Sequence, residues 1–288
     1  MNDPIFVVPW RRDLLNQLSG KAVVVVANGL DEMQTAIQVL DGMNVVLRCL
    51  VVRSKASLAS ISLKPEFANY PLAIYPSRLG RFQDLIRVLP ILRKMNVRVY
   101  FCAEDKKNCE AIRILASLGI ETVTTFESAT VQWDLLKDLA TYALLGIVPH
   151  AAIEPFHYIA SRFNPKEPLE WDSVYFDDPS TYLNVDEQGR VALTRTDLIE
   201  GRFLALSPAE VTIESRSQAL KEHYDSRSKF FLDRSPCAYC QGWRVCLGRF
   251  HAHKKKEQSC SEFFVELMDV IDCYNKGRGK QKDSVWQF

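Results

Sequence analysis

The chain has 288 residues, of which 47% are hydrophobic and 25% are charged. This length and composition predict two domains with cores of their own and exclude global disorder. The formal net charge of +1 argues against a protein that coats nucleic acid or a membrane with its whole surface.

The first half of the chain alternates strand and helix patterns. Short apolar runs rich in β-branched residues predict strands at Lys21–Ala27, Val45–Val52, Leu72–Tyr75, Val97–Cys102 and Ile120–Phe126. Apolar residues at helical spacing predict helices at Met33–Leu40, Arg81–Met95, Asn108–Leu118 and Thr130–Leu145. Five strands interspersed with four helices predict an α/β fold, a partial parallel (β/α) barrel with helices outside. A sixth strand is a further candidate at Ile147–Pro155.

A change of pattern near residue 160 predicts a domain boundary. Residues 161–182 contain three prolines and the acidic pair Asp177 and Asp178, which is typical of a linker. We therefore expect a partial barrel over residues 1–160 and a small α+β domain with a basic tail over residues 161–288.

The second half contains fewer regular elements. A turn signal at Asp186–Gly189 predicts a β-hairpin over Tyr182–Thr194. Helices are predicted over Pro208–Tyr224 and from about Ser261 to Tyr274, on either side of a cysteine-rich loop.

The sequence contains no recognisable secretion signal and no apolar run long enough to span a bilayer. The cytoplasm is therefore the expected compartment, with no membrane partner. Thiols stay reduced there, so closely spaced cysteines indicate a metal or cluster site rather than disulfides.

The eight cysteines are unevenly distributed, with none between residues 110 and 236. Cys237, Cys240, Cys246 and Cys260 have the spacing C-x2-C-x5-C-x13-C. A C-x2-C turn lets two sulfurs converge on one centre, and structural zinc usually takes two such close pairs. The irregular second pair favours a larger iron–sulfur cluster, with zinc as the alternative.

Other residues near the loop bear on this site. Ser259 and Glu262 form a capping-box pattern that would place Cys260 at the positive end of a helix. His251 and His253 are alternative ligands for zinc, although a solvated position is the simpler interpretation. Residues 226–256 contain eight Lys or Arg and one Asp, a local net charge of +7.

The cysteine region resembles the SPASM domain, the C-terminal auxiliary-cluster domain of many radical SAM enzymes that modify peptides. The family pattern is C-x9–15-G-x4-C, a gap, C-x2-C-x5-C-x3-C, a gap and a final cysteine, which implies two auxiliary [4Fe–4S] clusters. The four cysteines match C-x2-C-x5-C and the final position, so the resemblance implies that they hold the second auxiliary cluster. Phe250 and Leu206 stand where cysteines of the first cluster would be, and Gly201 and the hairpin resemble the family framework.

The first 160 residues are similar in their order of elements to the radical SAM partial barrel. The C-x3-C-x2-C loop that holds that family's catalytic cluster is absent, since Cys102 and Cys109 are separated by six residues. Ala27–Leu30 stands where the SAM-binding Gly-Gly-Glu would be and departs from it. We therefore expect no SAM, no catalytic residues and no radical initiation by this chain.

The expected function is that of a non-catalytic accessory protein with one [4Fe–4S] cluster. It would form a hetero-oligomer with a radical SAM enzyme in the modification of a ribosomally made (RiPP) precursor peptide, for substrate presentation or electron relay. One alternative is a zinc-stabilised interaction module that contacts nucleic acid or an acidic partner through the basic loop; nucleic acid is the less favoured partner. Another is an enzyme with an unrecognised pocket, ranked last because no acid–base or nucleophile constellation is visible.

The remaining candidates have simpler interpretations. Cys49 and Cys102 lie on predicted buried strands and are expected in the core, and Cys273 is expected to pack on the last helix. His157 follows a Pro-Phe pair and is expected to be structural.

Overall fold

The computed structural model describes residues 3–103, 105–126, 131–250 and 257–279. The chain forms two compact units, which we call the first and the second unit. The first unit consists of residues 1–100 and 172–226, and the second of residues 101–171 and 227–288. Each unit is therefore built from two separate stretches of chain, whereas the predicted domains are consecutive.

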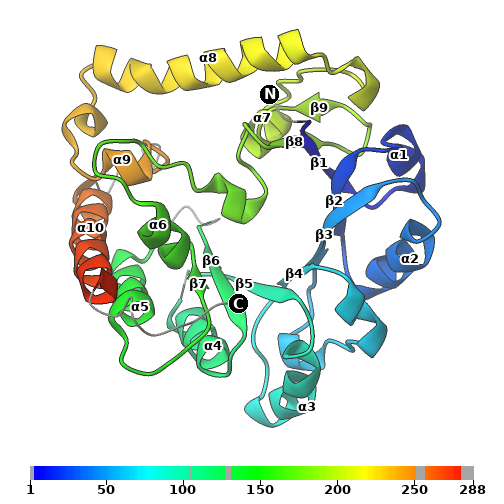
Figure 1. Cartoon of the computed structure of the whole chain (residues 1–288), viewed down its shortest axis with the longest axis horizontal. Helices are drawn as coiled ribbons and strands as arrows, with labels where there is room; N and C mark the ends of the chain where they lie inside the picture. The colour runs from blue at the N-terminus through cyan, green and yellow to red at the C-terminus, as the bar shows by residue number, and fades with distance from the viewer. Residues whose placement is uncertain (1–2, 104, 127–130, 251–256, 280–288) are drawn as a thin grey trace. The chain divides into compact units, whose positions relative to one another are not determined.

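The first unit contains a mostly parallel sheet (Figure 1). Its strands are β1 (Ile5–Pro9), β2 (Ala22–Ala27), β3 (Val46–Arg53), β4 (Leu72–Tyr75), β5 (Val97–Cys102, which runs on to the start of the second unit), β8 (Tyr182–Val185) and β9 (Val191–Ala192). They hydrogen-bond in the order β5-β4-β3-β2-β1-β8-β9. These neighbours pair in parallel except β8 and β9, which are antiparallel.

The first unit has five helices among the described residues. They are α1 (Arg12–Gln17), α2 (Leu30–Leu40), α3 (Phe82–Leu92), α7 (Arg195–Ile199) and α8 (Ile213–Leu232), whose last turns belong to the second unit. In β2, Val23, Val24 and Val25 are all completely buried, as expected for a parallel strand covered on both faces. The apolar face of α2 packs against β2 and β3 and buries Met33 and Leu40.

The predicted hairpin is confirmed, and it extends the parallel sheet. Residues Asp186 and Arg190 close its turn with a 3.0 Å backbone hydrogen bond, and Gly189 adopts a φ of 86° that favours glycine. Its first strand, β8, pairs with β1, so that Ile5 faces Ala22 on one side and Tyr182 on the other. The strand β1 is thus hydrogen-bonded along both edges.

The second unit contains the strands β6 (Glu121–Thr125) and β7 (Ile153–Glu154), which pair in parallel. Its helices are α4 (Lys106–Ser117), α5 (Trp133–Leu145), α6 (Phe156–Arg162), α9 (Trp243–Cys246) and α10 (Glu257–Gly279). The helices α5 and α10 lie side by side (Figure 1) and form the main helix pair of this unit.

The α/β class and the parallel strands are confirmed, while several boundaries differ from the prediction. The strand β1 and the helices α1 and α6 were not predicted. Of the candidate strand Ile147–Pro155, only Ile153–Glu154 forms a strand, β7. Ile147 lies outside it and is 98% exposed. The predicted helix over Pro208–Tyr224 begins only at Ile213, after a 3₁₀ turn at Pro208–Glu210.

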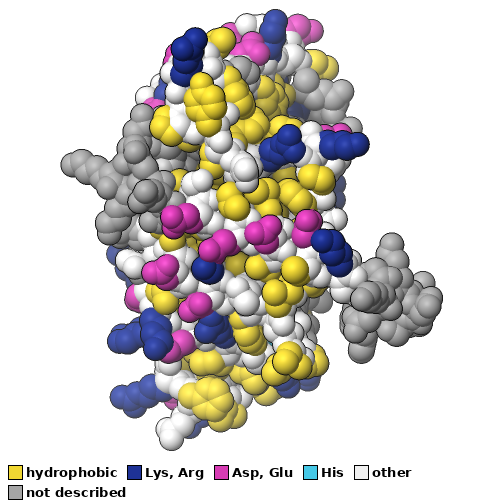
Figure 2. Space-filling view, turned by 90° about the vertical axis from the view of Figure 1, so that its left-hand side faces the viewer, with side chains coloured by type: hydrophobic (Ala, Val, Ile, Leu, Met, Phe, Trp, Pro, Cys, Tyr) yellow, Lys and Arg dark blue, Asp and Glu magenta, His cyan; other side chains and the backbone are white. Residues whose placement is uncertain are grey.

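No helix in the described ranges is long and apolar enough to cross a membrane. On the face shown in Figure 2, which is the left-hand side of Figure 1, acidic side chains form a band. The helix α10 contributes exposed Glu262, Asp269 and Asp272 to the acidic surface of its unit.

Candidate metal centre

The four cysteines with the C-x2-C-x5-C-x13-C spacing lie in or next to two short helical turns and at the start of the long helix α10 of the second unit. Cys237 lies in a 3₁₀ turn, η5 (Pro236–Tyr239), and Cys240 follows this turn directly. Cys246 is the last residue of α9, and Cys260 lies in the first turn of α10. All four are free thiols, and Cys246 is the most buried of them.

Neighbouring thiols influence the ionisation of Cys246 and Cys260. Cys260 interacts electrostatically with Cys240 and Cys237, and Cys246 interacts with Cys260. Burial raises the pKa of Cys246 to about 11 and also raises the pKa of Cys260, and the neighbouring thiols raise both further. Cys246 is therefore a neutral thiol at pH 7 and must lose its proton to ligate a metal.

Backbone amides donate to two of the sulfurs. The N–H groups of Phe250 and Gly248 donate to the Cys246 sulfur and lower its pKa, opposing the effect of burial. The turn that supplies them contains two successive residues with positive φ, Leu247 at 54° and Gly248 at 75°. Amides at the start of α10 act in the same way on Cys260. Such donors stabilise thiolates, so this donor set fits a thiolate-bound metal group.

The thiols do not yet form a coordination sphere for one ion. In the described ranges, no group of three or more His, Cys, Asp or Glu side chains is arranged to hold a metal ion. A tetrahedral zinc with Zn–S bonds of about 2.3 Å would need its sulfurs about 3.8 Å apart. Loading of a metal group therefore has to draw the sulfurs into place, which couples binding to local folding.

A short strap, residues 169–171, holds the segment that carries Cys246. The Trp171 indole N–H donates to the Val245 carbonyl at 2.7 Å, and the Leu169 N–H donates to the Arg244 carbonyl at 2.9 Å. Trp171 is completely buried, and the Arg249 guanidinium lies 3.8 Å from its ring centroid. The predicted linker thus contains a buried anchor of the candidate site.

Phe250 packs in an aromatic cluster beneath the cysteine loop. The side chain is 4% exposed, and its ring centroid lies 5.0 Å from Trp133, 5.5 Å from Phe126 and 5.7 Å from Phe264. The ring therefore belongs to the hydrophobic core of the second unit, where offset and edge-to-face aromatic pairs are favourable.

Gly242 lets the cysteine loop approach α10 closely. A Cβ atom at this position would lie 2.6 Å from the Phe264 Cβ, which is closer than packing allows, and 3.6 Å from the Cys240 sulfur. On the same side, the Cys240 thiol donates to the Ser261 hydroxyl at 3.4 Å. The absence of a side chain at residue 242 thus brings Cys240 next to the helix that carries Cys260.

No family profile, curated protein or solved structure matches this chain. The interpretation of the site therefore depends on its own residues and their geometry.

The other cysteines are separate from this site. The expectation that Cys49 lies in the core is confirmed, whereas Cys102 is only half-buried at the end of β5. Cys109, on α4, is also buried. Burial raises the pKa of Cys49 to about 12. The expectation that Cys273 packs is wrong, because α10 places it on its exposed face.

The structure bears on two of the residues near the site, Ser259 and His157. The helix α10 begins at Glu257, so Ser259 lies inside its first turn and the prediction that Ser259 caps the helix is wrong. His251, His253 and the three lysines at 254–256 lie outside the described residues. His157 has a local structural role, since its Nδ1 accepts a hydrogen bond from the Ile153 N–H at 3.0 Å.

Proposed function

We propose that this chain holds one [4Fe–4S] cluster with Cys237, Cys240, Cys246 and Cys260. The observation that carries the proposal is the electrostatic interaction that links these four thiols, with backbone amides donating to the sulfurs of Cys246 and Cys260. When bound, such a cluster supplies a one-electron redox centre or a structural staple. The resemblance of the spacing to the second auxiliary site of SPASM domains supports the choice of an iron–sulfur cluster over zinc.

We further propose that the protein is a non-catalytic accessory partner of a radical SAM enzyme that modifies a ribosomally made peptide. The proposal is supported by the SPASM-like spacing and by a mostly parallel α/β fold, which is compatible with a degenerate radical SAM barrel. The sequence has no C-x3-C-x2-C loop, so the three thiolates of a SAM-reducing cluster are missing. At residues 27–30, where the SAM-binding Gly-Gly-Glu would be, Gly29 precedes α2 and the Asn28 N–H donates to the Glu32 carboxylate at 2.7 Å.

Anaerobic purification of the full chain tests the cluster directly. We expect a brown protein with about four iron and four sulfide per chain. Substitution Cys260→Ser should remove most of the iron, because it deletes one of four ligands. The matched control is Cys273→Ser, an exposed cysteine on the same helix, which should leave the iron content unchanged.

Two outcomes would overturn the assignment. A colourless protein with one zinc per chain would establish the alternative zinc-stabilised module. Equal loss of iron in both variants would show that Cys260 is not a specific ligand. The accessory role is tested by co-purification from the native host, where a partner with a C-x3-C-x2-C loop is expected and its absence under anaerobic conditions would contradict the role.

A further inference from the structure

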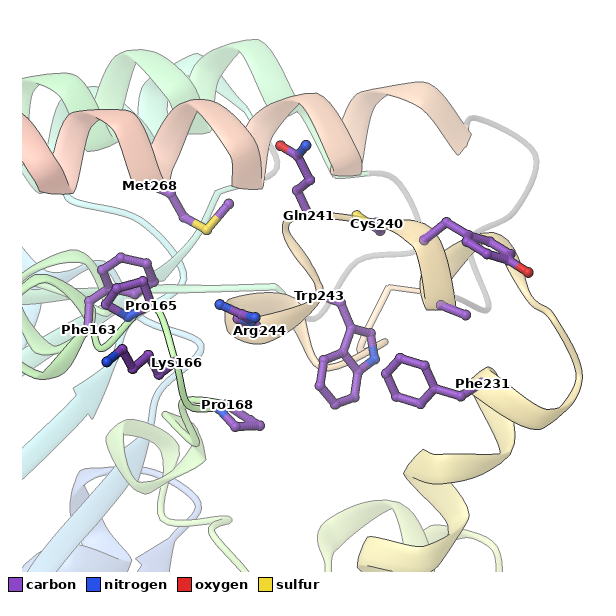
Figure 3. Close-up of a pocket in the computed structure, with 12 residues that line it drawn as sticks. Phe163, Pro165, Lys166, Pro168, Phe231, Cys240, Gln241, Trp243, Arg244 and Met268 are labelled. Carbon is purple, nitrogen blue, oxygen red and sulfur yellow. The ribbon is translucent and has the colours of Figure 1, made fainter.

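A cavity of about 620 Å³ lies in the second unit beside Cys240. Its walls come from the segment after α6, the end of α8, the cysteine loop and α10 (Figure 3). Cavities of this size are in the range that holds a small molecule or a few side chains of a peptide. The pocket was not recognised from the sequence, because its walls come from segments far apart in the chain.

The cavity is mostly apolar and partly aromatic. Its apolar lining includes Phe163, Pro165, Pro168, Phe231, Trp243 and Met268. The Phe231 and Trp243 rings pack edge to face, with their centroids 4.8 Å apart, and form one wall (Figure 3). Such walls favour a flat or bulky apolar group, because burying it there removes apolar surface from water.

The charged side chains in the lining are all basic. Lys166 and Arg244 are members of the lining, and no Asp or Glu is among the lining residues. In the part of the chain that the structure describes, neither side chain forms an ion pair. In the view of Figure 3, Arg244 lies between Lys166 and Trp243, so positive charge adjoins the aromatic wall. A ligand that pairs with these groups has to carry negative charge.

We infer that this cavity binds a peptide segment in which an aromatic side chain is flanked by carboxylates. The aromatic group would enter between Trp243 and Met268, and the carboxylates would meet Arg244 and Lys166 at the rim. The choice of a peptide as ligand rests on the proposed accessory function, whereas the preference for an aromatic and acidic group rests on the cavity alone. Cys240 lines the same cavity, so a bound peptide would lie next to the proposed cluster.

Calorimetric titration of the full chain with three capped tripeptides tests this inference. The probes are Asp–Phe–Asp, Lys–Phe–Lys and Asp–Ala–Asp, each acetylated and amidated to remove terminal charges. We expect saturable binding of Asp–Phe–Asp that weakens as salt is added, since screening reduces attraction between exposed charges. The other two probes should bind at least about tenfold more weakly, because each lacks one of the two recognised groups.

Charge reversal locates the binding in this cavity. The double variant Lys166→Glu/Arg244→Glu should bind Asp–Phe–Asp at least about tenfold more weakly and should bind Lys–Phe–Lys better than the unmodified chain does. Neither side chain is buried, so the substitutions should leave folding intact. The matched control is Lys221→Glu, an exposed basic residue of α8 outside the lining, which should leave both affinities unchanged.

The same titrations separate this inference from the cluster proposal. Equal affinity for the acidic and basic probes, equal loss in the Lys221→Glu control, or no saturable binding to either the cluster-loaded or the metal-free chain would overturn the inference. Binding of Asp–Phe–Asp to a chain that takes up no iron would support the cavity as a binding site while the cluster proposal fails. Iron uptake without binding of any probe would support the cluster proposal and overturn the inference about the cavity.

Discussion

Phe250 lies four residues after Cys246, at the end of the described part of the cysteine loop. Its ring is 4% exposed and contacts Trp133, Phe126 and Phe264. The sequence alone did not show that this side chain belongs to a core. This packing depends on Phe126 and Trp133, more than a hundred positions earlier, which no local pattern connects to residue 250.

Substitution Phe250→Ala should lower the free energy of unfolding by about 3–5 kcal/mol, because it leaves a cavity among packed rings. Chemical denaturation followed by circular dichroism measures this change. The control Phe82→Ala removes a ring that is 56% exposed, and it should cost about 0.5 kcal/mol. Equal effects of the two substitutions would show that Phe250 does not belong to the core.

At the scale of elements, the cysteine loop depends on its close approach to α10. Gly242 has an ordinary φ of −71°, so its backbone conformation would accept any residue. What requires glycine is the position of Phe264, whose Cβ lies only 2.6 Å from the place that a Cβ of residue 242 would occupy. Glycine is therefore required at residue 242 by packing against Phe264 and not by the backbone conformation of the turn.

Substitution Gly242→Ala should push the loop away from α10, reduce the iron content of the purified chain and lower stability by about 1–3 kcal/mol through overpacking. Iron analysis and thermal unfolding measure the two effects. Gly277→Ala is the matched control, because a Cβ at residue 277 of α10 meets open space. We expect this control to keep its iron and to be as stable as the original chain or slightly more so. Retention of full iron content by Gly242→Ala would contradict the role of the close approach.

The regular elements of the first half were predictable because their signals are local. The run of valines in β2 and the spacing of apolar residues in α2 each lie within a dozen residues. The sequence did not indicate the strap at residues 169–171, because the prolines near it are typical of a linker. Its hydrogen bonds connect it to residues about seventy positions later in the chain. The four thiols were selected from spacing alone, but the amides that face them could be found only from the turn geometry.

At the scale of the whole molecule, the candidate site lies entirely in the second unit. A metal group that draws the four thiols together should therefore order this unit locally and leave the sheet of the first unit unaffected.

If the proposed cluster is present, its removal with a chelator under anaerobic conditions should increase amide exchange at residues 237–250 and in the first turn of α10. Hydrogen–deuterium exchange read by mass spectrometry measures this change. The strands β2 and β3 are the internal reference, and their protection should stay constant, because they belong to the first unit. Loss of protection in β2 and β3 to the same extent would mean that the cluster stabilises the whole chain. Unchanged exchange at residues 237–250 would mean that the loop does not hold the cluster.

The position of β1 between β2 and β8 has a consequence for how the protein is made. During translation β1 gains its neighbour β2 early, but its other neighbour emerges only with residue 182. Until then, one side of the nascent sheet leaves its peptide groups unpaired, which is the kind of edge that invites association with other chains. The edge of β1 is covered only when β8 has been synthesised and has paired with it.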